Sequence, residues 1–169
     1  VSKSPAKFDI KKLNNINAKN LNSMKTSDIY KLVIDRFKLS LNDEEQKRFK
    51  SLLPELLKRV QVYTDLELEF DWLFQKDFFC KDENYQLKLQ KHNLMLREIG
   101  SQLKECEWSV ENIKNTLNQY ILDKSLTFKD IGPILRIALT GSTSSPSIVH
   151  IMEILGEHQT LDRLNIIVD

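Results

Sequence analysis

The sequence predicts an all-α protein with about nine or ten helices, on three observations. Apolar side chains recur every three or four positions along most of the 169 residues, which places them on one face of a helix. Patterns that alternate at every second residue, as a half-buried strand requires, are nearly absent. The chain also contains only four Gly and four Pro, too few for a protein built from short strands and tight turns.

Residues 1–63 are predicted to form four helices after a short lead segment. Asp9 and the pair Thr26 and Ser27 have side chains that accept hydrogen bonds from the free N–H groups of a first helical turn, so each marks a helix start. Pro54 suits the first turn of a later helix, because its missing N–H costs no hydrogen bond there. The expected helices cover 9–21, 26–37, 43–49 and 55–63.

The next segment, up to residue 122, is predicted to contain three helices. One begins at Thr64 or Asp65 and ends before an aromatic-rich break at 77–80. A long helix over 83–105 follows, and Ser109 caps a third over 110–122. The long helix is expected to bury a single apolar stripe that includes Leu87, Leu94, Ile99 and Leu103.

The C-terminal segment is predicted to contain three more helices. Thr127 caps a helix that ends at Gly141, since Gly readily adopts the left-handed conformation found after helix C-termini. Pro146 is expected to open the following helix and Gly156 to close it. A last helix is predicted to begin at Thr160.

The sequence changes character near 39–43, which predicts a division into 1–40 and 41–169. A further division of the second part is expected near 78–84. The first part is locally basic, because its opening 25 residues carry six Lys against a single Asp. The chain starts at Val1 rather than Met, so we expect a piece of a longer protein or a processed product.

Composition excludes several protein classes. Apolar residues make up 41% of the chain and charged residues 29%, as in a soluble globular protein. No apolar run approaches the roughly 20 residues of a membrane span, so a cytoplasmic protein is expected. The net charge of +1 gives no global sign of a nucleic-acid partner. Cys80 and Cys106 are far apart without a CxxC pair, which favours two free thiols over a zinc site or a disulfide.

The sequence offers no pattern of catalytic or metal-binding residues. His92, His150 and His158 share no short spacing with an acid or a nucleophile, and no glycine loop that could cradle a phosphate occurs. We therefore expect no catalytic, metal-binding or cofactor-binding residue in these 169 residues. The remaining class of function is binding.

The strongest candidate for a binding site is the stretch 135–147, LRIALTGSTSSPS. Arg136 lies at the border of the apolar stripe of its helix, so its guanidinium is expected to reach solvent. The hydroxyl-rich turn after Thr140 leads through Ser145 to a helix start, where hydroxyls and free N–H groups would suit RNA phosphates or base edges. The same residues also fit a capped corner between two helices in a protein-interaction module.

Residues 135–164, LRIALTGSTSSPSIVHIMEILGEHQTLDRL, resemble the C-terminal signature of bacterial glutamyl-tRNA synthetases. That signature is an Arg, ALTG, a Ser/Thr stretch, a Pro, an apolar helix, a Gly and a closing [ST]-L-[DE]-R-[LI]. The opening SKSPAKFDIKKLNNINAKNL is similar to the segment that follows the family's catalytic domain, and LLPELLKRVQVYTDL and WSVENIKNTL are similar to two further helices. The family's HIGH-type and KMSKS-type ATP motifs do not occur in this sequence.

The resemblance implies the non-catalytic C-terminal part of a glutamate–tRNA ligase, an enzyme that attaches glutamate to tRNA(Glu) by using ATP with Mg²⁺ bound in a separate catalytic domain. It implies a stem-contact segment over 1–40 and an anticodon-binding cage over 41–169, in a monomer whose catalytic domain belongs to the same polypeptide. Whether tRNA(Gln) is a second partner stays open. The alternative is a helical protein–protein interaction module that binds no RNA.

The resemblance also implies two sets of contact residues. The tRNA anticodon loop is expected to meet Arg136, Thr140, Ser145, Pro146, Ile148 and Arg59. The tRNA stem is expected to meet Lys11, Lys12 and Lys19.

Overall fold

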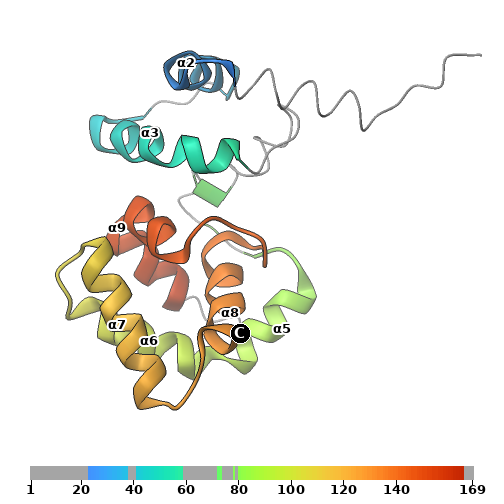
Figure 1. Ribbon diagram of the computed structural model, residues 1–169. Helices are drawn as coiled ribbons and strands as arrows, with labels where there is room; N and C mark the ends of the chain where they lie inside the picture. Colours follow the sequence, from blue (N-terminus) through green and yellow to red (C-terminus); the bar gives the residue numbers. More distant parts are fainter. Residues whose placement is uncertain (1–22, 38–40, 59–71, 74–77, 79, 166–169) are drawn as a thin grey trace, which may run out of the picture. The chain divides into compact units, whose positions relative to one another are not determined.

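A computed structural model of the chain describes residues 23–37, 41–58, 72–73, 78 and 80–165 (Figure 1). Every regular element within these ranges is an α-helix, which confirms the all-α prediction. The chain divides into two compact units, Val1–Glu69 and Phe70–Asp169. The helices of the described ranges are α2 (Thr26–Phe37), α3 (Asp43–Leu57), α5 (Glu83–Lys91), α6 (Asn93–Lys104), α7 (Val110–Asp123), α8 (Phe128–Thr140) and α9 (Ile148–Asn165).

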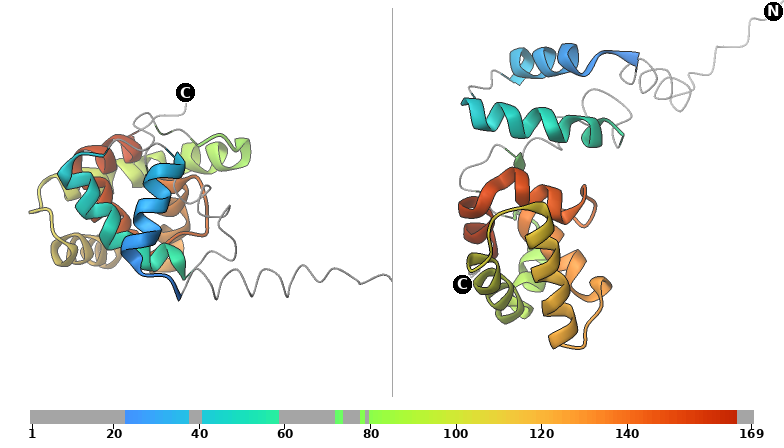
Figure 2. Two further views of the ribbon diagram at one scale, coloured as in Figure 1. Left: turned by 90° about the horizontal axis from the view of Figure 1, so that it is seen from above. Right: turned by 60° about the vertical axis from the view of Figure 1, so that its left-hand side comes forward.

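In the first unit, α2 and α3 lie side by side, as both views of Figure 2 show. The predicted stripe of α2 is confirmed at Ile29 and Val33, which are buried. The ring of Tyr30 packs against Phe49 of α3 with 5.5 Å between the ring centroids. This contact joins the two helices of the first unit. The assignment of 1–40 to a separate function stays a prediction.

The single helix α3 covers the helix predicted over 43–49 and the start of the one predicted over 55–63, of which 59–63 lie outside the described residues. Pro54 lies inside α3 rather than in a first turn, so that prediction is wrong. A proline within a helix costs about 3 kcal/mol. The neighbouring side chains of Leu52, Leu53 and Leu56 are fully buried, and burying each contributes about 1.5–3 kcal/mol. Tertiary burial therefore outweighs the local penalty, and the helix continues through the proline.

The long helix predicted over 83–105 is also wrong, because α5 and α6 are separated at His92. The backbone of His92 has φ −108° and ψ 16°, outside the helical range. This break changes which side chains face the core. Leu87 and Leu94, expected in one buried stripe, are 64% and 72% exposed. Ile99 and Leu103 are buried as predicted, and Leu89 and Leu96 take the places expected for the other two.

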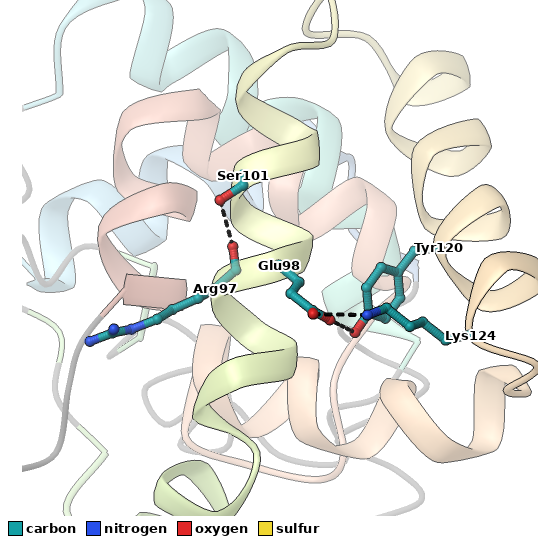
Figure 3. A network of polar contacts seen from close by, with 5 residues as sticks. All are labelled: Arg97, Glu98, Ser101, Tyr120 and Lys124. Carbon is teal, nitrogen blue, oxygen red and sulfur yellow. Dashed lines mark hydrogen bonds and ion pairs between the residues drawn. The ribbon is translucent and has the colours of Figure 1, made fainter.

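Helix α7 begins as predicted, because the Ser109 hydroxyl accepts a hydrogen bond from the Asn112 N–H at 3.2 Å. A polar network then joins α7 to α6 (Figure 3). The Tyr120 hydroxyl donates to Glu98 Oε2 at 2.7 Å, and Lys124 Nζ lies 2.8 Å from Glu98 Oε1. These two bonds lower the pKa of Glu98. Burial and the bond to Glu98 raise the pKa of Tyr120 to about 12.

Helix α9 packs against α6, α7 and α8, so the core of the second unit forms around it. The helical geometry breaks at Gly156, as predicted, where φ is 76° and ψ is 169°. The chain then continues as a second helical segment to Asn165, so the prediction that a new helix begins at Thr160 is wrong. The Thr160 hydroxyl instead donates across the break to the Met152 carbonyl at 3.3 Å.

Seven helices in the described ranges are fewer than the nine or ten predicted. Over 43–57 a single helix, α3, stands where two were predicted, and α9 counts as one helix although its geometry breaks at Gly156. The predicted helix over 9–21 lies outside the described residues, as does most of the helix expected from Thr64 or Asp65.

Candidate nucleic-acid interface

The α8–α9 corner, residues 141–147, contains the hydroxyl-rich turn singled out in the sequence. Gly141 ends α8 as predicted, with φ 69° in the left-handed region, and its N–H donates to the Ile137 carbonyl at 2.9 Å. A Cβ at position 141 would also lie only 3.2 Å from Phe78 Cζ. Both the backbone conformation and the close approach of Phe78 therefore require glycine here.

Hydroxyls in and next to the corner bond to nearby backbone groups. Thr140 Oγ1 donates to the Arg136 carbonyl at 2.9 Å, and Ser145 Oγ donates to the Pro146 carbonyl at 3.2 Å. Ser142 Oγ accepts a bond from the Ser144 N–H at 3.1 Å. Thr140 and Ser145 are buried, so the geometry supports a role in shaping the corner for these two hydroxyls.

The start of α9 lies two residues later than predicted. Pro146 and Ile148 are buried, and α9 begins at Ile148 rather than at Pro146. Ser147 occupies the position before the first turn, because its carbonyl accepts the N–H of Ile151 at 2.9 Å. The exposed residues of the corner are therefore Thr143, Ser144 and Ser147.

Arg136 lies one turn before the corner and is partly exposed, in agreement with the expected access to solvent. Its side chain extends back along α8, since a Cβ at Gly132 would lie 3.3 Å from Arg136 Nη1. The same Cβ would lie 2.9 Å from Phe128 Cε1. Within the described ranges no carboxylate forms an ion pair with Arg136.

A buried arginine that is not among the predicted contact residues joins α9 to the end of α8 next to the corner. Arg163 of α9 is only 4% exposed, and its Nη1 donates a hydrogen bond to the Leu139 carbonyl of α8. Its guanidinium lies 4.4 Å from the centroid of the Phe78 ring, the ring that also borders Gly141. Burial lowers the pKa of Arg163 to about 10, so the side chain remains charged at neutral pH.

The sequence contains a pattern that is compatible with a buried Arg163, but the same pattern also fits an Arg at the edge of the core. Arg163 stands beside the buried Leu164 and three residues after the buried Thr160, which is the spacing of the inner face of a helix. An Arg in such a position is usually assigned to the rim of a core, because long charged side chains extend to solvent. The exposure of Phe128 is not predicted by the sequence pattern. Phe128 is the first residue of α8, and its exposure depends on the path of the turn that precedes the helix.

Arg59, Lys11, Lys12 and Lys19 lie outside the described residues. Cys80 is buried, Cys106 is partly exposed, and both are free thiols. In the described part of the chain no group of three His, Cys, Asp or Glu side chains is arranged to hold a metal ion. No helix there is long and apolar enough to span a membrane.

Comparison with protein families gives a match over most of the chain. The family described as "Anticodon binding domain" matches residues 28–168. Glutamate–tRNA ligase 1 of Bartonella henselae is 29% identical over 176 residues, which cover 98% of this chain and 36% of that protein. Glutamate–tRNA ligase 2 of Rickettsia typhi is 30% identical over 173 residues, which cover 99% of this chain and 36% of that protein.

A solved structure shares the fold. The crystal structure of a glutamate tRNA ligase from Elizabethkingia meningosepticum in complex with its amino acid has a TM-score of 0.78 to this chain, at 21% sequence identity. The match covers 98% of this chain and 33% of that one. This chain therefore spans about a third of the length of the proteins that it matches.

Proposed function

The chain belongs to the anticodon-binding domain family, and on this basis we propose that it is the tRNA-binding part of a glutamate–tRNA ligase. The observation that carries the proposal is the family match over 28–168. The relatives that align with nearly the whole chain are glutamate–tRNA ligases. The proposed partner is tRNA(Glu), in the cytoplasm. Whether the parent protein also charges tRNA(Gln) is a separate question, which a charging assay with that tRNA answers.

We assign the chemical steps to the part of the parent protein that this chain does not cover. The chain aligns with 36% of the length of the Bartonella henselae ligase, and its own sequence has no ATP-binding motif. Activation of glutamate by ATP and Mg²⁺ therefore belongs to the catalytic domain of the same polypeptide. The role of this chain is to position the tRNA and to recognise its anticodon, as a monomer.

The proposed contact surface is the outer face of α8 with the exposed residues of the α8–α9 corner. Arg136 supplies a positive charge that no described carboxylate neutralises. The hydroxyls of Thr143, Ser144 and Ser147 face solvent and are able to bond to phosphate or base edges. Thr140, Ser145, Pro146 and Ile148 support this surface from within.

A binding measurement tests the proposal. The chain should bind tRNA(Glu) more tightly than an unrelated tRNA, and its affinity should fall as salt concentration rises, because cations released from phosphates drive binding. Absence of binding to both tRNAs would contradict the proposal and favour the helical protein-interaction module. Equal binding of both tRNAs would contradict anticodon recognition while leaving a general affinity for RNA.

A further inference from the structure

Phe128 and Arg136 lie next to one another on the outer face of α8. They are eight residues apart, with Gly132 midway between them, so all three lie along one side of the helix. A Cβ at Gly132 would be 2.9 Å from Phe128 Cε1 and 3.3 Å from Arg136 Nη1, so the ring and the guanidinium approach the same point. Gly132 is buried beneath them, although both neighbouring side chains reach solvent.

Phe128 presents a large aromatic side chain partly to solvent. The residue is 43% exposed, whereas the next apolar positions of α8, Ile131 and Leu135, are fully buried. Leaving this ring in water costs part of the free energy that burial would give, about 1.5–3 kcal/mol for a full Phe side chain. The start of α8 does not need Phe128, because the Thr127 N–H donates to Asp130 Oδ2 at 2.7 Å and so caps the helix.

We propose that Phe128 and Arg136 form a platform that stacks one unpaired base of the bound RNA. An exposed aromatic ring offers a face for a base, and an adjacent guanidinium attracts the base or its phosphate. Gly132 is what allows the two groups to meet, since any side chain there would displace the ring. This inference rests on the proposed function and adds to it a residue, Phe128, that reads the shape of an unstacked base rather than its edge.

The test uses the full 169-residue chain and an RNA stem-loop with the anticodon arm of tRNA(Glu). Phe128→Leu keeps an apolar side chain but removes the aromatic face, and it should weaken binding about 5- to 100-fold, the range that stacking of one base is worth. Phe128→Trp keeps the aromatic face and should bind about as tightly as the unchanged chain. Leu122→Ala removes a side chain that is 70% exposed on α7 and serves as the matched control.

Stem-loops that lack one base at a time identify the partner of the platform. At one loop position, removal of the base should abolish the difference between the unchanged chain and Phe128→Leu, because the stacked base is then absent. Gly132→Ala should weaken binding in the same way, since its Cβ would displace the Phe128 ring. Circular dichroism of each variant establishes that the helical fold is retained.

The possible failures are distinct. If the unchanged chain binds the stem-loop and Phe128→Leu binds equally tightly, the platform is refuted and the proposed function stands. The same conclusion follows if Phe128→Leu weakens binding equally for every stem-loop that lacks one base. If the unchanged chain does not bind the stem-loop, both the proposed function and the platform are refuted.

Discussion

Arg163 Nη1 donates a hydrogen bond to the Leu139 carbonyl and so joins the second segment of α9 to the last turn of α8. Carbonyls in a last helical turn have no partner within the helix and carry the negative end of its dipole. A buried cation is therefore favourable at this point. The planar guanidinium also packs on Phe78, so one side chain connects three segments of the second unit.

Replacing Arg163 with Met should lower the free energy of unfolding by about 1–3 kcal/mol, because the buried Leu139 carbonyl loses its donor. Arg163→Lys should recover only part of this loss, since an ammonium group cannot both stack flat on Phe78 and reach the carbonyl. Urea denaturation followed by circular dichroism measures the effect. Arg97→Met, on the exposed face of α6 (Figure 3), is the control and should change stability by less than about 0.5 kcal/mol. Equal stability of both variants would contradict the role of Arg163.

Tyr120 should make the protein sensitive to alkaline pH. The pKa of Tyr120 is raised from 10.0 to about 12 by burial and by its bond to Glu98. Its contribution to stability is complete below pH 10. Between pH 10 and 12 the unfolded chain loses the phenolic proton while the folded chain retains it, so stability falls in this range. Thermal melting from pH 8 to 12 should show a steeper decline for the unchanged chain than for Tyr120→Phe. Parallel declines would show that Tyr120 is not the group responsible.

Gly156 should tolerate no side chain, whereas Gly100 should. The backbone at Gly156 has φ 76° and ψ 169°, which other residues adopt only with strain, so Gly156→Ala should destabilise the chain by about 1–3 kcal/mol. Gly100 lies within α6, and a Cβ there would meet its nearest neighbour, Asn165 Oδ1, at 3.7 Å, an ordinary contact. Gly100→Ala should therefore be neutral or stabilising by up to about 1 kcal/mol, because Ala favours a helix over Gly. Similar melting temperatures for the two variants would contradict the conclusion that the kink in α9 requires Gly156.

Arg136→Ala should weaken binding of the tRNA(Glu) anticodon stem-loop, and the pattern of loss shows which group Arg136 contacts. A base contact predicts a loss of discrimination against one altered anticodon base, worth about 1–3 kcal/mol. A phosphate contact predicts an equal loss for every stem-loop and a shallower dependence of affinity on salt. Unchanged affinity and discrimination would remove Arg136 from the interface. Filter binding at two salt concentrations separates these results.

Local signals in the sequence predicted much of the fold of this chain. Ser109 and Gly141 mark helix ends through bonds to residues within four positions, and these contacts depend on neighbouring sequence alone. The errors at Pro54 and His92 have a different origin. The path of the backbone there depends on which leucines the rest of the fold can bury, and such distant partners are invisible to a local pattern.

The candidate interface was predicted only in part for the same reason. The partial exposure of Arg136 follows from its position beside an apolar stripe, and the structure agrees with it. Arg163 and Leu139, which are joined by a hydrogen bond, are 24 residues apart in the sequence. Phe78, whose ring contacts the guanidinium, is even more distant from Arg163 in the sequence. No spacing rule relates such positions. The pairing of Phe128 with Arg136 becomes apparent only when the close contacts over Gly132 are known.

The central position of α9 determines the order in which the second unit can fold during synthesis. Helices α6, α7 and α8 leave the ribosome before residues 148–165, yet their shared core includes Ile151 and Met152, which are completely buried. Until α9 has emerged, the nascent chain exposes the apolar faces that will later surround it, and such intermediates aggregate readily. A chain that ends after residue 147 would therefore expose α6, α7 and α8 without their common partner, which is the kind of surface that chaperones bind.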